Sequence, residues 1–232
     1  MCGINGLVNI HTADRLKLIE RMNNRIIHRG PDMQAVIEFP NCLLGHVRLS
    51  IIDLVSGGQP MQSHDQEISI VFNGEIYNYK ELKEKLTSAG YSFKTNSDTE
   101  VVLLAFHAWN VKALTYFKGM FSLIIFDRLA QKLYLIRDRF GVKPLYYFLD
   151  NDLLLFGSEL KPLHVHPRYK KELNTKSIWC FFQYGNIPSP HSIFNQTFKV
   201  EPGTIVTIDC NTLHLEKNTF WSPEQAFQKV PL

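Results

Sequence analysis

The chain opens with Met1-Cys2-Gly3-Ile4-Asn5-Gly6, which places a thiol at the second position. Removal of the initiator methionine would leave Cys2 with both a thiol and a free α-amino group. Because an α-amino group has a pKa of roughly 7.7–8.0, it can take the proton of a neighbouring thiol. One residue would then be nucleophile and base together. The alternative is that Cys2 is a small buried hydrophobic residue at the start of a strand, as cysteine often is.

The length and composition are typical of one large domain, or at most two small ones, and argue against several function classes. The 232 residues are 45% hydrophobic and 20% charged, which is enough to bury a substantial core. Lys and Arg outnumber Asp and Glu by only 25 to 22, without a basic block, so we expect no nucleic-acid partner. The longest strongly apolar run, residues 121–126, is far too short to span a bilayer, so we expect no membrane role.

The cysteines and histidines fit a reducing compartment without a metal site. Cys2, Cys42, Cys180 and Cys210 are widely separated, without the spacing of a zinc site or a disulfide framework. The nine histidines show no metal-binding spacing. No basic and apolar leader opens the chain, so no signal peptide is expected. These features predict a cytoplasmic protein that binds no metal.

Hydrophobic periodicity predicts segregated strands and helices. Strands are expected at residues 2–10, 35–39, 43–49, 68–72, 121–127, 132–137, 145–149, 153–157, 204–209 and 213–217. Helices are expected at residues 14–27, 78–89, 98–109 and 177–183. A loop is predicted at residues 56–60. A turn is predicted at Asn73-Gly74, where it would end the strand at residues 68–72. The short connections between residues 121 and 157 predict an antiparallel meander. Together these elements indicate an α+β fold rather than a doubly wound parallel sheet.

Polar motifs follow the predicted strands and helices in a particular order. They are the Cys2 run, His28-Arg29-Gly30-Pro31-Asp32, Arg48-Leu49-Ser50-Ile51-Ile52-Asp53, Asn73-Gly74-Glu75-Ile76-Tyr77-Asn78 and Ser97-Asp98-Thr99-Glu100. Each motif alone has an ordinary structural interpretation, since Asn-Gly forms turns and Ser-Asp caps helices. Only their order behind a second-position cysteine makes the set specific.

With these motifs in this order, the chain resembles the class II glutamine amidotransferase domain of the N-terminal-nucleophile hydrolases. The HRGPD, RLSI and NGEIYN variants are similar to its asparagine synthetase branch. The resemblance runs from Cys2 to about Lys161 and continues more weakly to Pro202-Gly203. Further matching segments are Gly119-Met120-Phe121, Arg137-Asp138-Arg139-Phe140-Gly141, Pro144-Leu145-Tyr146-Tyr147 and Gly157-Ser158-Glu159-Leu160-Lys161. It implies a four-layer αββα sandwich of two antiparallel sheets, with Cys2 at the start of a central strand and residues 121–127 and 132–137 as inner strands.

The resemblance also implies a catalytic set. Cys2 would attack the side-chain amide of L-glutamine, giving a γ-glutamyl thioester and ammonia. The Asn73 side chain and the Gly74 N–H would form the oxyanion hole, in which each donor is typically worth about 3–4 kcal/mol. A glycine suits this position because a residue without Cβ lets the backbone approach closely.

A substrate-binding set is implied in the same way. Arg48 would hold the α-carboxylate of glutamine through its planar guanidinium, and Asp98, with Glu75 beside it, would hold the α-ammonium group. Backbone groups around Ser50 would line the pocket. The implied set is Arg48, Leu49, Ser50, Ile51, Ile52, Asn73, Gly74, Glu75 and Asp98. Four other residues in matching motifs are expected to be structural or to support the pocket, namely Asp32, Arg137, Asp138 and Glu159, and His28 is expected to be a structural hydrogen-bonding residue.

The resemblance divides the chain into a glutaminase domain over residues 2–210 and a linker over residues 211–232. The linker would lead to an ATP-dependent synthetase domain in cis or in trans, so ATP and Mg²⁺ would belong there and no cofactor is expected in this chain. Ser56-Gly57-Gly58 looks like the start of a pyrophosphate loop, but Gln59-Pro60 follow and the strand–loop–helix context is missing. The chain would be either a truncated product or a free-standing glutaminase subunit.

Several alternatives remain at this point. The chain could be a non-catalytic module that binds a partner synthetase, or an amidotransferase for a cell-surface sugar precursor. A sugar-phosphate or phosphoribosyl amidotransferase is disfavoured because its motif variants are missing. Residues 221–232 have no clear partner. Without a synthetase domain, the aromatic residues Trp179, Phe181, Phe182 and Tyr184 are expected to form an exposed patch, which favours self-association into a homo-oligomer or poor solubility.

Overall fold

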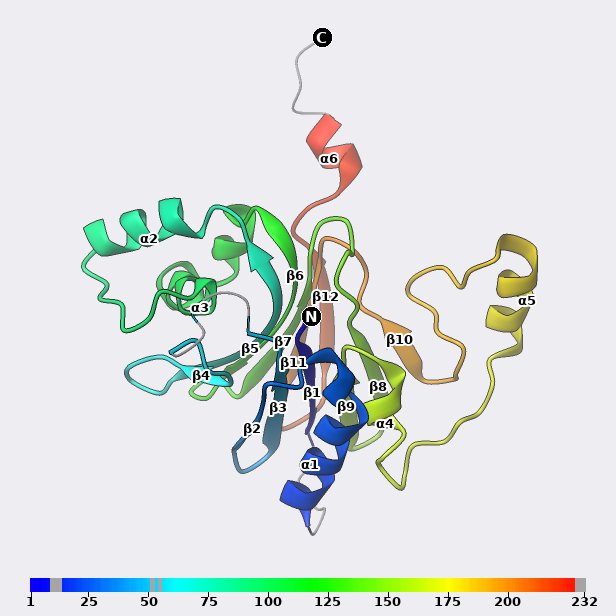
Figure 1. The fold of residues 1–232 in the computed structure, drawn as a ribbon. Helices are drawn as coiled ribbons and strands as arrows, with labels where there is room; N and C mark the ends of the chain where they lie inside the picture. The colour runs from blue at the N-terminus through cyan, green and yellow to red at the C-terminus, as the bar shows by residue number, and fades with distance from the viewer. Residues whose placement is uncertain (9–13, 51–52, 54–55, 228–232) are drawn as a thin grey trace.

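The computed structural model describes residues 1–8, 14–50, 53 and 56–227, which form two antiparallel six-stranded sheets with helices outside them (Figure 1). The first sheet has the strand order β10-β8-β9-β1-β3-β2 and the second β12-β11-β7-β6-β5-β4. The first sheet contains β1 (Gly3–Val8), β2 (Met33–Glu38), β3 (Cys42–Arg48), β8 (Tyr146–Asp150), β9 (Leu153–Gly157) and β10 (Thr197–Lys199). The second contains β4 (Met61–Gln62), β5 (Ile68–Ile76), β6 (Gly119–Asp127), β7 (Lys132–Arg137), β11 (Thr204–Asp209) and β12 (Leu215–Thr219).

The helices lie mainly on the outer faces of the sheets (Figure 1). The α-helices are α1 (Arg15–Arg25), α2 (Tyr79–Ser88), α3 (Asp98–Trp109), α4 (Leu160–Leu163), α5 (Thr175–Tyr184) and α6 (Pro223–Phe227), and the 3₁₀ helices are η1 (Ile27–Arg29) and η2 (Asn110–Thr115). Helices α1 and α4 pack on the first sheet and α3 on the second, whereas α5 projects from the body. Among the described residues, no helix is long and apolar enough to cross a membrane.

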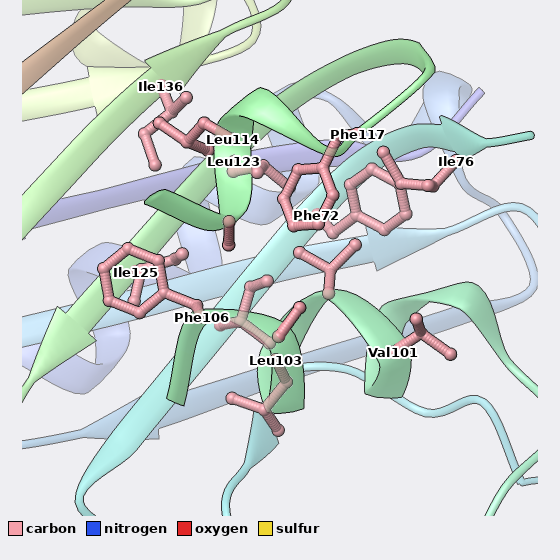
Figure 2. Close-up of a cluster of buried hydrophobic side chains, with 14 of the residues drawn as sticks. Phe72, Ile76, Val101, Leu103, Phe106, Leu114, Phe117, Leu123, Ile125 and Ile136 are labelled. Carbon is pink, nitrogen blue, oxygen red and sulfur yellow. The ribbon is translucent and has the colours of Figure 1, made fainter. Parts of the chain in front are cut away.

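Strand alternation gives the sandwich its layers. On β6, Ile124 and Phe126 face the core between the sheets, whereas Leu123 and Ile125 face α3. The cluster on the α3 side also contains Phe72 and Phe106 (Figure 2). A third cluster joins α1 and α4 to the first sheet. Three apolar clusters between four layers confirm the predicted αββα sandwich of the α+β class.

The strongly periodic elements lie where the sequence predicts them. The residues of α3, β7, β9 and β11 match their predicted ranges, and Ser97 caps α3 by accepting a hydrogen bond from the Glu100 N–H. As predicted, Cys2 directly precedes the central strand β1, and β6 and β7 are inner strands. The 56–60 segment lies outside regular helices and strands, as expected. Residues 9 and 10 of the first predicted strand lie outside the described residues.

Two predictions of local structure are wrong. Asn73-Gly74 is not a turn, because β5 continues through both residues and pairs them with Ser122 and Phe121 of β6. A Cβ at Gly74 would lie 2.1 Å from the Met120 carbonyl oxygen, so close pairing with β6 is what requires glycine there. The meander is also wrong, because β7 and β8 lie in different sheets. Within the predicted meander, the antiparallel pairs that form are β6–β7 and β8–β9.

Candidate active site

Residues from the predicted motifs, except those of residues 28–32, line one cavity of about 150 Å³ beside the start of β1. The residues predicted for the site that line this cavity are Cys2, Arg48, Leu49, Asn73, Gly74, Glu75 and Asp98. Ser50 does not line it, but its N–H donates to the Asp32 Oδ2 at 2.8 Å, which anchors the adjoining chain. Ile51 and Ile52 lie outside the described residues. A thiol, a carboxamide, a guanidinium and carboxylates therefore share one small space.

Cys2 is held in place through its backbone. The Arg29 Nε donates to the Cys2 carbonyl oxygen at 3.0 Å, and Arg29 pairs with Glu159 at 3.1 Å. The His28 Nε2 hydrogen-bonds the same Glu159 carboxylate at 2.9 Å. The HRG and GSE segments thus fix the start of β1. The thiol itself donates to the Leu49 carbonyl oxygen at 3.6 Å.

The surroundings of the Cys2 thiol act on its pKa in opposite directions. Burial raises the pKa of Cys2 and Asp98 raises it as well, whereas the Met1 ammonium group and the Arg48 guanidinium lower it. Because burial dominates, the thiol needs a nearby base to become a nucleophile.

Asn73 and Gly74 are consecutive residues of β5 and form part of the cavity wall. The Asn73 side chain is buried, and its Nδ2 donates weakly to the Ser122 Oγ at 3.4 Å. Its Oδ1 has no hydrogen-bond partner among the described residues. A buried amide group with an unsatisfied atom calls for an explanation, and a site for a polar ligand provides one.

Arg48 ends β3 and is only 5% exposed. Its guanidinium donates to the Asp53 carbonyl oxygen at 2.5 Å, and the Asp53 side chain accepts from the Asn96 N–H at 2.8 Å. A Cβ added to Gly57 would lie 2.7 Å from the Arg48 Nη2. The 56–60 loop therefore packs directly against the guanidinium.

Asp98 is the first residue of α3 and is 5% exposed. Its Oδ2 accepts from the Ile76 N–H at 3.1 Å. Burial raises the pKa of Asp98 to about 6, although backbone hydrogen bonds act in the opposite direction, and Glu75 raises it further. The cavity thus holds a guanidinium and a carboxylate, which suits a small zwitterion.

Other residues also line the cavity, although the sequence did not point to them as site residues, namely Met1, Gly57, Gln59, Phe72, Ser97, Thr99, Met120 and Lys143. Lys143 lies in the loop after β7. The Asp138 carboxylate holds this loop in place by accepting hydrogen bonds from the backbone N–H groups of Phe140, Val142 and Lys143. Arg137 donates to three carbonyl oxygens around the same loop. The RDRFG segment, which matches the family, lies just before Lys143 and is the sequence feature that could have pointed to it.

A separate group of potential metal ligands lies among the described residues. Asp65, Glu67 and His107 each bring one donor atom within 4.8 Å of the others. None of the three lines the cavity around Cys2. The His107 Nε2 hydrogen-bonds the Asp65 Oδ2 at 2.8 Å, so the imidazole and carboxylate already satisfy each other. Sequence spacing does not reveal this group because His107 comes from a distant helix.

Comparison with known proteins identifies the family of the chain. The model of the glutamine amidotransferase domain family matches residues 1–221. Asparagine synthetase [glutamine-hydrolyzing] 1 of Bacillus subtilis is 42% identical over 212 residues, covering 90% of this chain and 33% of its own length. A putative asparagine synthetase of Methanocaldococcus jannaschii is 39% identical, covering 95% of this chain and 46% of its own length. The chain thus spans between a third and a half of these relatives.

Solved structures support the fold. Glutamine phosphoribosylpyrophosphate amidotransferase from B. subtilis superposes with a TM-score of 0.65 at 19% identity, covering 95% of this chain and 49% of that one. At this identity the likeness concerns the fold alone. The family match over nearly the whole chain and the relatives' identity carry the assignment. The chain belongs to the glutamine amidotransferase domain family.

Proposed function

We propose that this domain hydrolyses L-glutamine to glutamate and ammonia at the cavity around Cys2 after removal of Met1. The carrying observation is that the thiol, the Asn73 amide, the Arg48 guanidinium and the Asp98 carboxylate line one cavity. A module that only binds a partner does not require a thiol beside these three polar groups.

The reaction follows from these groups. The α-amino group of Cys2 takes the thiol proton, and the sulfur attacks the side-chain amide carbon of glutamine. The Asn73 amide and the Gly74 N–H donate to the oxyanion that forms. As the tetrahedral intermediate collapses, its amide nitrogen takes the proton from the α-ammonium group and leaves as ammonia, and a γ-glutamyl thioester remains. Water activated by the same amino group then releases glutamate and restores the thiol.

Recognition of both ends of free glutamine follows from Arg48 and Asp98. The guanidinium pairs with the α-carboxylate and the carboxylate with the α-ammonium group. A glutamine side chain within a protein carries neither charge, so it would form neither of these two ion pairs. Leaving one member of a buried pair alone costs about 3–5 kcal/mol, which selects free glutamine.

The ammonia is proposed to serve ATP-dependent asparagine synthesis from aspartate, as the names of the matched relatives suggest. The synthetase domain, with ATP and Mg²⁺, would be supplied in cis or in trans in the cytoplasm. In this scheme residues 2–210 are the glutaminase domain and residues 211–232 lead toward the synthetase. Strand β12 within the latter segment pairs with β11. The exposed aromatic residues of α5 are the proposed contact with the synthetase.

The test is ammonia release from L-glutamine by the purified chain, with Cys2→Ala and Cys180→Ala compared. Cys180 is a half-buried thiol outside the cavity and is the matched control. We expect Cys2→Ala to abolish release, Cys2→Ser to leave a feeble remnant and Cys180→Ala to behave as wild type. Unchanged release from Cys2→Ala would refute the assignment. No release from the wild-type chain would favour the non-catalytic module.

A further inference from the structure

Gln59 joins two separate parts of the cavity wall through its side chain. It is 6% exposed and lines the cavity, although no motif points to it. Its Oε1 accepts from the Phe72 N–H at 2.6 Å, and its Nε2 donates to the Thr99 Oγ1 at 3.1 Å. Phe72 immediately precedes Asn73, and Thr99 immediately follows Asp98. One carboxamide therefore bridges the neighbours of the proposed oxyanion donor and the proposed ammonium acceptor.

The topology explains why a side chain makes this bridge. Strand β4 pairs only Met61 and Gln62 with β5, opposite Ile70 and Ser69. Continuing this register places Gln59 opposite Phe72, beyond the end of the paired stretch. The Phe72 N–H is buried there, and a buried donor without a partner is costly. The Gln59 side chain replaces the missing strand neighbour, while the Phe72 carbonyl oxygen contacts the His46 Nε2 at 3.3 Å.

We propose that Gln59 is a positioning residue that fixes the Asn73 amide relative to the Asp98 carboxylate. The proposal rests on the proposed glutaminase function. Glutamine held at its α-end by Arg48 and Asp98 must present its side-chain amide to Cys2 and Asn73 at the other end. The spacing between β5 and α3 therefore decides whether a bound substrate is aligned, and a misplacement of about 1 Å can cost about a hundredfold in rate.

The kinetic test is Gln59→Met, which keeps the length of the side chain and removes both hydrogen bonds. We expect kcat for glutamine hydrolysis to fall about tenfold while KM stays within about threefold, because alignment rather than charge pairing is lost. The matched control is Gln62→Met. Gln62 is half-buried, donates to the Ser69 Oγ at 3.2 Å and does not line the cavity, so its variant should match wild type.

A second readout separates positioning from general damage. The rate at which an electrophilic glutamine analogue labels Cys2 should fall about tenfold in Gln59→Met, because that reagent must be aligned through its α-end. Alkylation of Cys2 by iodoacetamide needs no such alignment and should stay within about twofold of wild type. Equal loss with both reagents would mean a disturbed thiol and would overturn the proposal.

Thr99→Val provides a milder variant should Gln59→Met fold poorly. It removes only the partner of the Gln59 Nε2 and keeps the bond to Phe72, so kcat should fall about threefold with an unchanged KM. If wild type is not labelled by the analogue at Cys2, the proposed function itself fails. If wild type is labelled and both variants match it in kcat, the function stands and the positioning role of Gln59 is refuted.

Discussion

At Asp98, burial and substrate binding act in opposite directions. Burial raises the pKa of this carboxyl group to about 6, yet only its ionised form can pair with the α-ammonium group of glutamine. The α-amino group of Cys2 must also lose a proton to act as base, and α-amino groups in general titrate at roughly pH 7.7–8.0. Two groups must therefore be deprotonated for the free enzyme to be active.

The pH profile should reveal both groups. As the pH falls, log kcat/KM for glutamine should decline with a slope of about one below pH 8 and about two below pH 6, because a second proton then disables Asp98. The Asp98→Asn variant should have a higher KM and should keep the slope of one throughout. Steady-state kinetics between pH 4.5 and 8.5 provide the measurement. A wild-type profile without a second break would contradict the role of Asp98.

At the scale of elements, the 56–60 loop decides where the Arg48 guanidinium lies. An added Cβ at Gly57 would come within 2.7 Å of the Arg48 Nη2 and 2.9 Å of the Asp53 carbonyl oxygen. Gly57→Ala should therefore displace the guanidinium and raise KM for glutamine about tenfold, with a smaller effect on kcat.

Gly58→Ala is the matched control for this prediction. A Cβ at Gly58 would meet only the Met33 Cε, at 4.0 Å, which is an ordinary contact. Its KM should equal that of wild type. Equal KM values for the Gly57 and Gly58 variants would show that the loop does not position Arg48.

The elements also show what the sequence can reveal about fold. The ranges of α3, β7 and β9 are encoded by local periodicity, so they are predictable. Whether β7 and β8 share a sheet is not encoded locally, because it depends on the strands with which each pairs: β7 pairs with β6 and β11, whereas β8 pairs with β9 and β10. Asn73-Gly74 has the composition of a turn, but pairing with β6 overrides that local preference.

Some residues of the candidate site could likewise be predicted from the sequence, whereas others could not. The resemblance located Cys2, Arg48 and Asp98 because each belongs to a distinctive motif, and the structure places all three on one cavity. Gln59 was not predictable, because its partners lie 13 and 40 residues away along the chain. A residue whose role depends on long-range contacts leaves no local pattern.

For the molecule as a whole, α5 is the element least integrated into the sandwich. Figure 1 shows it projecting from the body, and Trp179 and Phe182 are 67% and 82% exposed. Phe181 and Tyr184 are exposed as well, as predicted from the sequence. Contiguous exposed aromatic side chains usually mark an interface or cause association.

We therefore expect the isolated chain to self-associate through α5. Replacing Trp179 and Phe182 together by Gln should shift the chain toward monomer in sedimentation velocity while leaving kcat and KM for glutamine unchanged, since α5 contributes nothing to the cavity. The control is Phe140→Gln. Phe140 is exposed in the loop after β7, so this replacement should not alter association. A wild-type chain that stays monomeric at high concentration would contradict this expectation.

The central claim is that Cys2, freed from Met1, carries the acyl intermediate. The most direct measurement is peptide mass spectrometry of the chain quenched in acid during turnover of L-glutamine. We expect a chain that begins at Cys2 and carries a γ-glutamyl group on that residue alone. A γ-glutamyl group on Cys42, Cys180 or Cys210, or equal turnover by a chain that retains Met1, would contradict it.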